Sequence, residues 1–197
     1  MQRQFDFSDF LSGNMTHIPA DFLSDADLIQ QCKRGDMKSY ETLYTRYSRA
    51  MFQTSLRIVA VAADAEDILQ DAFMEAFTSL NKLKNAAAFG GWLKSIVIHK
   101  SINHVNRGKK NHLHIEADHA DELAIHETIV QKEFQFSVDV IQSAIAQLPP
   151  KYRTVVNLHI FEKKSFEEIA VLLETPSATI RSHYFRARQK LLSMVIK

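Results

Sequence analysis

The residues best suited to chemistry lie near the C-terminal end, where polar and cationic side chains fall on one side of an expected helix. At 100° per residue, apolar Ile180, Tyr184, Ala187 and Leu191 share one side. The opposite side holds hydrogen-bond donors, guanidinium groups and an aromatic ring, from Arg181, Ser182, Phe185, Arg186, Arg188 and Gln189. A DNA major groove accepts such a helix, and guanidinium groups can pair with guanine edges or hold phosphates. The alternative is a solvated basic face.

The residues before this helix predict a helix-turn-helix. Ser165 followed by Glu168 is the pattern of a capping box, so a helix is expected to begin there. Thr175 can cap a second helix with Pro176 at its first position, where a missing N–H costs nothing. Two helices joined by a tight turn form a helix-turn-helix, and its coincidence with the sided arginines favours DNA contact over a solvated face.

The whole chain predicts an all-α protein, because five glycines and four prolines leave few turns for a sheet. Ser24 is the expected N-cap of the first helix. Apolar residues recur at helical spacing over 39–60 and 64–80, and again after the Phe89-Gly90-Gly91 break as far as a glycine stop at Gly108. Further helices are expected near Leu123, from Phe134 to Leu148, and as three short helices in the tail.

Charge divides the 197 residues into blocks. Residues 21–110 have a net charge of +3 and 134–197 of +4, whereas 111–133 have −5. The sequence therefore predicts an N-terminal arm over 1–23, a four-helix domain over 24–110, a flexible acidic linker over 111–133, and a helix-turn-helix domain over 134–197.

Several classes of function have no residues to support them. There is no nucleophile–base constellation, glycine-rich phosphate loop or zinc-protease motif, so we expect no enzyme, no cofactor and no small-molecule substrate. Histidines in the linker could bind a metal, but no second tight pair completes a site, and we expect none. Cys32 could be a redox sensor with a lowered pKa or a semi-buried helix residue. No membrane insertion and a cytoplasmic location are expected.

Three separated motifs resemble the extracytoplasmic-function (ECF) subfamily of the sigma-70 family of bacterial RNA polymerase sigma factors. Asp64-Ala-Glu-Asp-Ile-Leu-Gln-Asp-Ala-Phe resembles the family's helix that docks on the polymerase clamp. Gly91-Trp-Leu and the residues after it resemble the helix that opens and reads the minus-ten promoter element. Leu148-Pro-Pro-Lys-Tyr-Arg, with Thr179-Ile-Arg-Ser further on, resembles the domain that reads the minus-thirty-five element as duplex. The motifs occur in the family's order and spacing.

The resemblance implies roles for particular residues. The polymerase-binding positions would be Asp67, Gln70 and Asp71. Residues reading the minus-thirty-five element would be Arg181, Ser182, Phe185, Arg186 and Arg188. Residues at the minus-ten element would be Trp92, His99, Lys100, Asn103, Arg107, Lys109 and Lys110. Taken alone, Trp92 favours a core residue over a stacking platform. His183 stands where the family often has arginine, and His99 and Asn103 replace an asparagine and an aspartate.

The family's partners would be core RNA polymerase, promoter DNA and an anti-sigma factor, with the polymerase performing the chemistry. Two other hypotheses remain open from the residues alone. A stand-alone DNA-binding regulator would use its N-terminal helices for dimerisation or ligand sensing and would prefer palindromic sites. A purely protein-binding module would not need the sided arginines.

Overall fold

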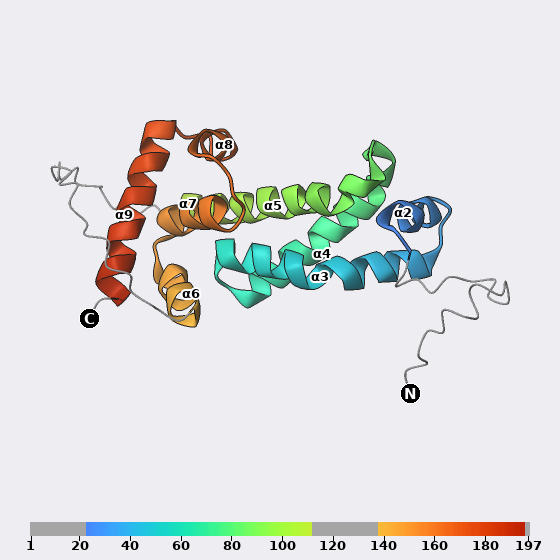
Figure 1. Cartoon of the computed structure of the whole chain (residues 1–197), viewed down its shortest axis with the longest axis horizontal. Coiled ribbons are helices and arrows are strands. Elements are labelled where there is room, and N and C mark those ends of the chain that lie inside the picture. The colour runs from blue at the N-terminus through green and yellow to red at the C-terminus, as the bar shows by residue number, and fades with distance from the viewer. Residues whose placement is uncertain (1–22, 112–137, 196–197) are drawn as a thin grey trace. The chain divides into compact units, whose positions relative to one another are not determined.

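The computed structural model describes residues 23–111 and 138–195, and every regular element among them is helical (Figure 1). The expected all-α class is confirmed. The predicted helix near Leu123, the predicted start near Phe134 and the linker histidines lie outside the described residues. Compact packing divides the chain into two units. Of the described residues, the first unit comprises those up to Gln53 with Glu66–Val97, and the second comprises Thr54–Ala65 with those from Ile98 onward.

The first described helix, α2 (Asp25–Lys33), begins at the predicted N-cap. The Ser24 hydroxyl accepts a hydrogen bond from the Asp27 amide at 3.2 Å, and the Asp27 carboxylate accepts one from the Ser24 amide at 3.3 Å. This capping box satisfies backbone donors that have no partner within the helix. Leu28 and Ile29, in the middle of this helix, are buried in the core.

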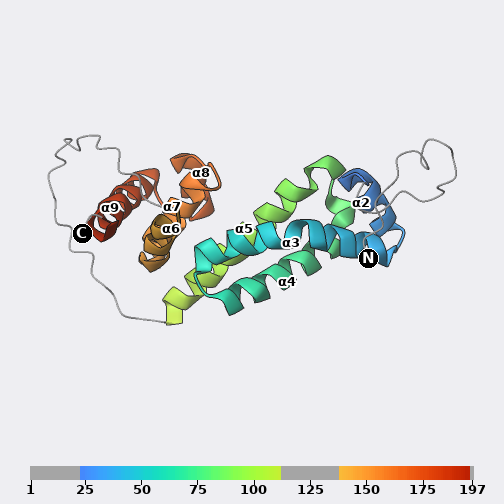
Figure 2. The ribbon, with the colours of Figure 1, turned by 60° about the horizontal axis from the view of Figure 1, so that its bottom comes forward.

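Two long helices, α3 (Met37–Val59) and α4 (Ala62–Thr78), lie within two residues of their predicted bounds. Figures 1 and 2 both show α3, α4 and α5 running alongside one another. Aromatic rings join α3 to α4: Tyr40 meets Phe77 edge-on at 4.9 Å between centroids, and Tyr44 meets Phe73 at 4.7 Å. Such pairs add directional stabilisation to the burial of apolar surface.

The Gly90-Gly91 pair does not interrupt the next helix, contrary to the sequence prediction. After two short 3₁₀ turns, η2 (Leu80–Lys82) and η3 (Ala86–Ala88), helix α5 (Phe89–Asn111) includes both glycines and continues through Gly108, the predicted stop. A Cβ at Gly90 would lie 2.7 Å from Cε1 of Tyr47. The glycine is therefore needed for close packing of α5 on α3, which outweighs a propensity loss of about 1 kcal/mol.

The helix-turn-helix part contains α6 (Val138–Gln147), α7 (Pro150–Ile160), α8 (Phe166–Leu172) and α9 (Ser177–Val195). Helix α9 contacts each of the other three. With 19 residues it is not one of the short helices that the sequence predicted. It is longer because its apolar side continues through successive turns, from buried Ile180 to buried Ala187 and half-buried Leu191.

Within the second unit, Arg153 of α7 is buried, and each of its three guanidinium nitrogens donates to a backbone carbonyl. Its Nε donates to the Ile58 carbonyl at 3.1 Å, its Nη2 to the Val59 carbonyl at 3.2 Å, and its Nη1 to the Ala146 carbonyl at 3.1 Å. The last carbonyl groups of a helix have no N–H donor within that helix. The Arg153 guanidinium supplies donors for two of them at the end of α3, those of Ile58 and Val59. Burial lowers the pKa of Arg153 below its ordinary value.

Candidate polymerase-binding and DNA-binding surfaces

One face of α4 presents an acidic, polar surface. Asp67, Gln70 and Asp71 are all exposed, as the sequence predicted. Met74, one turn further along the same face, keeps 67% of its surface exposed. The opposite face is buried through Ile68, Leu69, Ala72, Phe73 and Ala76. Two carboxylates beside an exposed methionine suit a basic protein partner with an apolar contact at its centre.

A second polar face runs along α5. His99, Asn103 and Arg107 are exposed and lie within about 80° of one another around the helix. Lys100 is half-buried. Lys109 and Lys110 belong to the last turns of α5, where the structure does not describe the side chains. These donors and cations can hold a phosphate backbone, which is sequence-independent and salt-sensitive binding.

Trp92, at the start of α5, is half-buried and packs against the core of the first unit. Its ring centroid lies 6.2 Å from that of Phe89, which is fully buried. The packing role that the sequence favoured for this residue taken alone is therefore present.

The first helix of the helix-turn-helix, α8, begins at the predicted capping box. The Glu168 amide donates to the Ser165 hydroxyl at 3.1 Å, and the Ser165 amide donates to the Glu168 carboxylate at 2.8 Å. The hydrogen bonds from Ser165 hold the pKa of Glu168 below its ordinary value. Ile169 is fully buried beneath this turn and anchors the helix.

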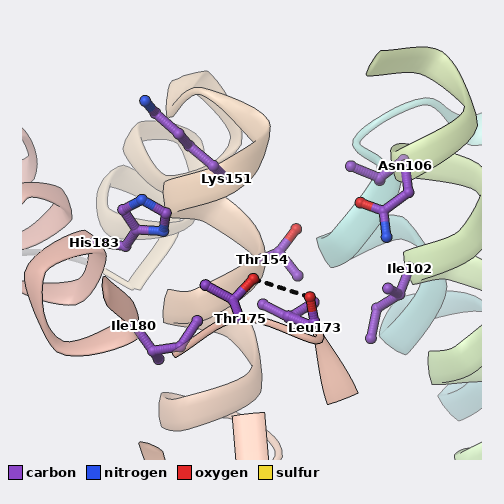
Figure 3. Close-up of a pocket in the computed structure, with 9 residues that line it drawn as sticks. Ile102, Asn106, Lys151, Thr154, Leu173, Thr175, Ile180 and His183 are labelled. Carbon is purple, nitrogen blue, oxygen red and sulfur yellow. Dashed lines mark hydrogen bonds between the residues drawn. The ribbon is translucent and has the colours of Figure 1, made fainter. Parts of the chain in front are cut away.

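The turn between α8 and α9 differs in detail from the prediction. Helix α9 begins at Ser177, one residue later than expected. The Thr175 hydroxyl donates to the Leu173 carbonyl at 2.9 Å (Figure 3), so its recorded bond satisfies the end of α8 instead of capping α9. Glu174, between them, has a φ of 49°, in the left-handed region. This left-handed residue ends α8, and the amide of the next residue, Thr175, donates to the Ala170 carbonyl at 3.0 Å.

The outer side of α9 carries the residues predicted to read duplex DNA. Arg181, Ser182 and Arg188 are exposed, Phe185 is 37% exposed and Arg186 is half-buried. The side facing the protein contains Ile180 and Ala187, both fully buried. The guanidinium groups of Arg181 and Arg188 therefore point away from the interior, as groove contact requires.

The sequence patterns did not reveal a carboxylate that contacts Arg181 on the exposed side of α9. Nη2 of Arg181 lies 2.5 Å from Oε1 of Glu167, and the two side chains are 56% and 63% exposed. The residues are 14 positions apart on different helices, so no spacing rule within one helix could have predicted the pair. His183, the residue in place of a common arginine, is half-buried with its ring edge-on to Tyr152 at 5.5 Å between centroids.

Cys32 is not a sensor with a lowered pKa, so that alternative is wrong. The residue is 1% exposed, and burial, followed by the charge of Asp36, raises the pKa of its thiol to about 11. A thiol that stays protonated at neutral pH is a poor nucleophile.

Within residues 23–111 and 138–195, no three histidine, cysteine, aspartate or glutamate side chains gather as a metal site would require. In the same ranges, no helix combines the length and apolar character needed to cross a bilayer.

Comparisons with known proteins agree on one family. Residues 43–111 match sigma-70 region 2, and residues 139–191 match sigma-70 region 4. The chain is 31% identical to the RNA polymerase sigma-H factor of Pseudomonas aeruginosa over 179 residues, covering 85% of this chain and 91% of that one. It is 28% identical to the ECF RNA polymerase sigma-E factor of Escherichia coli K12 over 178 residues, covering 86% and 93%.

A solved structure shows the same fold. The sigma factor RpoE of Bartonella quintana, solved in complex with the anti-sigma factor NepR, aligns with a TM-score of 0.50 at 18% identity. The alignment covers 80% of this chain and 97% of that one.

The fold is that of a helical protein with a helix-turn-helix near its C-terminal end, and the matched families are those of DNA-binding, non-enzymatic sigma factors. The chain belongs to the ECF subfamily of the sigma-70 family, and it is a sigma factor that directs transcription initiation by RNA polymerase. Membership of this family decides against the stand-alone regulator and the purely protein-binding module.

Proposed function

We propose that the two helical parts share promoter recognition. Residues 24–110 would bind core polymerase and melt the minus-ten element, and residues 134–197 would read the minus-thirty-five element as duplex. The acidic linker over 111–133 would connect them and occupy a path otherwise filled by nucleic acid. The matches to region 2 over 43–111 and to region 4 over 139–191 support this division.

The observation that carries the proposal is that α9 is buried on one side and exposed on the other. Ile180 and Ala187 fasten the helix to its own domain, and Arg181, Ser182 and Arg188 remain exposed on the other side. In this role the arginines pair with guanine edges or phosphates, and Phe185 supplies an apolar contact of the kind made with a thymine methyl group. Arg186, which is half-buried, would contact the groove from the edge of the exposed side of α9.

The N-terminal surfaces have separate tasks in this proposal. Asp67, Gln70 and Asp71 would bind a basic surface of the polymerase clamp. Trp92, His99, Lys100, Asn103, Arg107, Lys109 and Lys110 would meet the minus-ten element, with the cations holding its phosphates. Holding the two DNA-binding surfaces apart at promoter spacing would be the task of the polymerase, which also performs the chemistry.

The proposal includes a cytoplasmic location and control by an anti-sigma factor. The Bartonella quintana relative is described in complex with such a factor. A partner of this kind would act by covering the polymerase-binding or DNA-binding surfaces.

The test is run-off transcription with core polymerase, with and without this protein, on a pool of promoter fragments. We expect fragment-specific transcripts only when the protein is present. If an active core enzyme yields none across a wide range of candidate promoters, the proposal fails. Footprinting of the same complexes would show whether both promoter elements are protected.

A further inference from the structure

The pairing of Glu167 with Arg181 places an anionic side chain on the surface proposed to bind an anionic polymer. Oε1 of Glu167 lies 2.5 Å from Nη2 of Arg181, and both side chains are more than half exposed. A carboxylate at this place lowers the attraction of the helix-turn-helix for phosphates in general. Its presence therefore needs a reason other than affinity.

Both partners are held on well-anchored helices. Glu167 lies in the first turn of α8, next to the Ser165–Glu168 capping box and two residues before fully buried Ile169. Arg181 directly follows fully buried Ile180 on α9. Because both backbones are fixed, the ion pair restricts the orientation of the guanidinium more than a pair between two mobile segments would.

The guanidinium retains enough donors to read a base while it is paired. Arginine has five N–H donors, and the recorded bond to Glu167 uses one on Nη2. A fork to the O6 and N7 atoms of guanine needs two of those that remain. A phosphate approaching from another direction must either break the ion pair or lie close to the carboxylate.

We propose that Glu167 is a specificity-determining residue, which orients Arg181 toward one base of the upstream promoter element and disfavours its binding to phosphates elsewhere. This inference rests on the proposed role of Arg181 in reading that element. In the free protein the pair presets the arginine, and in the complex it is retained beside the contacted base.

The experiment uses holoenzyme assembled from core polymerase and the full chain. The probe is a duplex pool with a random upstream segment and a fixed downstream element, from which wild-type holoenzyme enriches a preferred sequence. Binding of the enriched fragment and of a shuffled fragment is then measured for wild type, Glu167→Gln and Glu174→Gln. Glu174 is an exposed carboxylate in the same motif and makes no ion pair with any described residue, so its variant gives the same charge change without touching Arg181.

We expect Glu167→Gln to lower the ratio of enriched to shuffled affinity by about three-fold, as the loss of an exposed ion pair implies. The lost preference should concentrate at one position of the selected sequence, where a guanine is no longer enriched. Glu174→Gln should raise binding of both fragments equally. A merely structural role for Glu167 would weaken all positions together.

Arg181→Ala separates the two hypotheses. If that variant binds the enriched fragment as well as wild type does, the proposed reading role fails. If Arg181→Ala loses the preference but Glu167→Gln behaves like Glu174→Gln, only the role of Glu167 is overturned. The role of Glu167 is also overturned if Glu167→Gln still changes the ratio of enriched to shuffled affinity when Arg181 is already alanine.

Discussion

Gly90 of α5 lies so close to Tyr47 of α3 that a Cβ at residue 90 would come within 2.7 Å of the Tyr47 ring. The ring cannot easily move away, because the Tyr47 hydroxyl hydrogen-bonds to the carboxylate of Asp25 and the ring packs edge-on to Phe89 at 5.5 Å between centroids. Burial and the bond to Asp25 raise the pKa of Tyr47 to about 12, so the phenol remains a donor at neutral pH.

Gly90→Ala should therefore destabilise the N-terminal helices by about 1–3 kcal/mol, the usual effect of overpacking. Gly91→Ala is the matched control, since a Cβ there meets nothing within 4 Å and alanine favours a helix. Thermal unfolding followed by circular dichroism should show a lower Tm for the first variant and an unchanged or higher Tm for the second. Equal stability of the two variants would contradict the close approach.

Reversing charge on α4 should abolish polymerase binding without unfolding the helix. Asp67→Lys with Asp71→Lys replaces two exposed carboxylates on the face opposite the core, so the packing is left intact. The control is Glu41→Lys, which reverses an exposed charge on α3. Pull-down of core polymerase measures the effect, and circular dichroism checks the helices. If the double variant still binds core polymerase, the polymerase-binding surface must lie elsewhere on the protein.

Removing two guanidinium groups from α9 should abolish recognition of the minus-thirty-five element and leave polymerase binding unchanged. Each arginine–base contact contributes about 1–3 kcal/mol of discrimination, so Arg181→Ala with Arg186→Ala should lower selective binding by at least ten-fold. Footprinting of holoenzyme on promoter DNA measures this selective binding, and pull-down of core polymerase is the internal control. Loss of both activities together would mean that the domain had unfolded.

The capping box of α8 predicts a pH dependence of stability. The pKa of Glu168 is lowered in the folded chain, so its contribution is present above the ordinary value of 4.5 and is lost as the pH falls through the folded value. Ser165→Ala removes the hydroxyl, which helps to lower this pKa and accepts the Glu168 amide, but keeps the backbone N–H that donates to the carboxylate. Loss of the cap should lower stability at neutral pH by about 1 kcal/mol.

The wild type should then lose more stability than Ser165→Ala when urea unfolding is compared at neutral and acid pH. Other carboxylates titrate alike in both proteins, so their effect cancels in the difference. In a Glu168→Gln background the difference should vanish. A wild-type profile parallel to that of Ser165→Ala would show that the Ser165 hydroxyl does not lower the pKa of Glu168.

Local patterns in the sequence were enough for the starts of α2 and α8 and for the two faces of α4 and α9, but not for the length of α9. The capping boxes at Ser24 and Ser165 depend on residues three apart, and the two faces of α4 and α9 follow from 100° per residue. Three motifs in the right order were enough for the family. These features involve contacts within one or two helical turns, and so they are written in neighbouring residues.

Features that join distant residues were decided by the tertiary structure. Gly90 was predicted as a break and Gly108 as a stop, but a glycine stays helical where packing demands it, and Tyr47 lies more than forty residues earlier. The pair of Glu167 with Arg181 and the bonds of Arg153 to the end of α3 likewise join different helices. Local propensity cannot reveal such contacts, because they exist only once the helices have packed against one another.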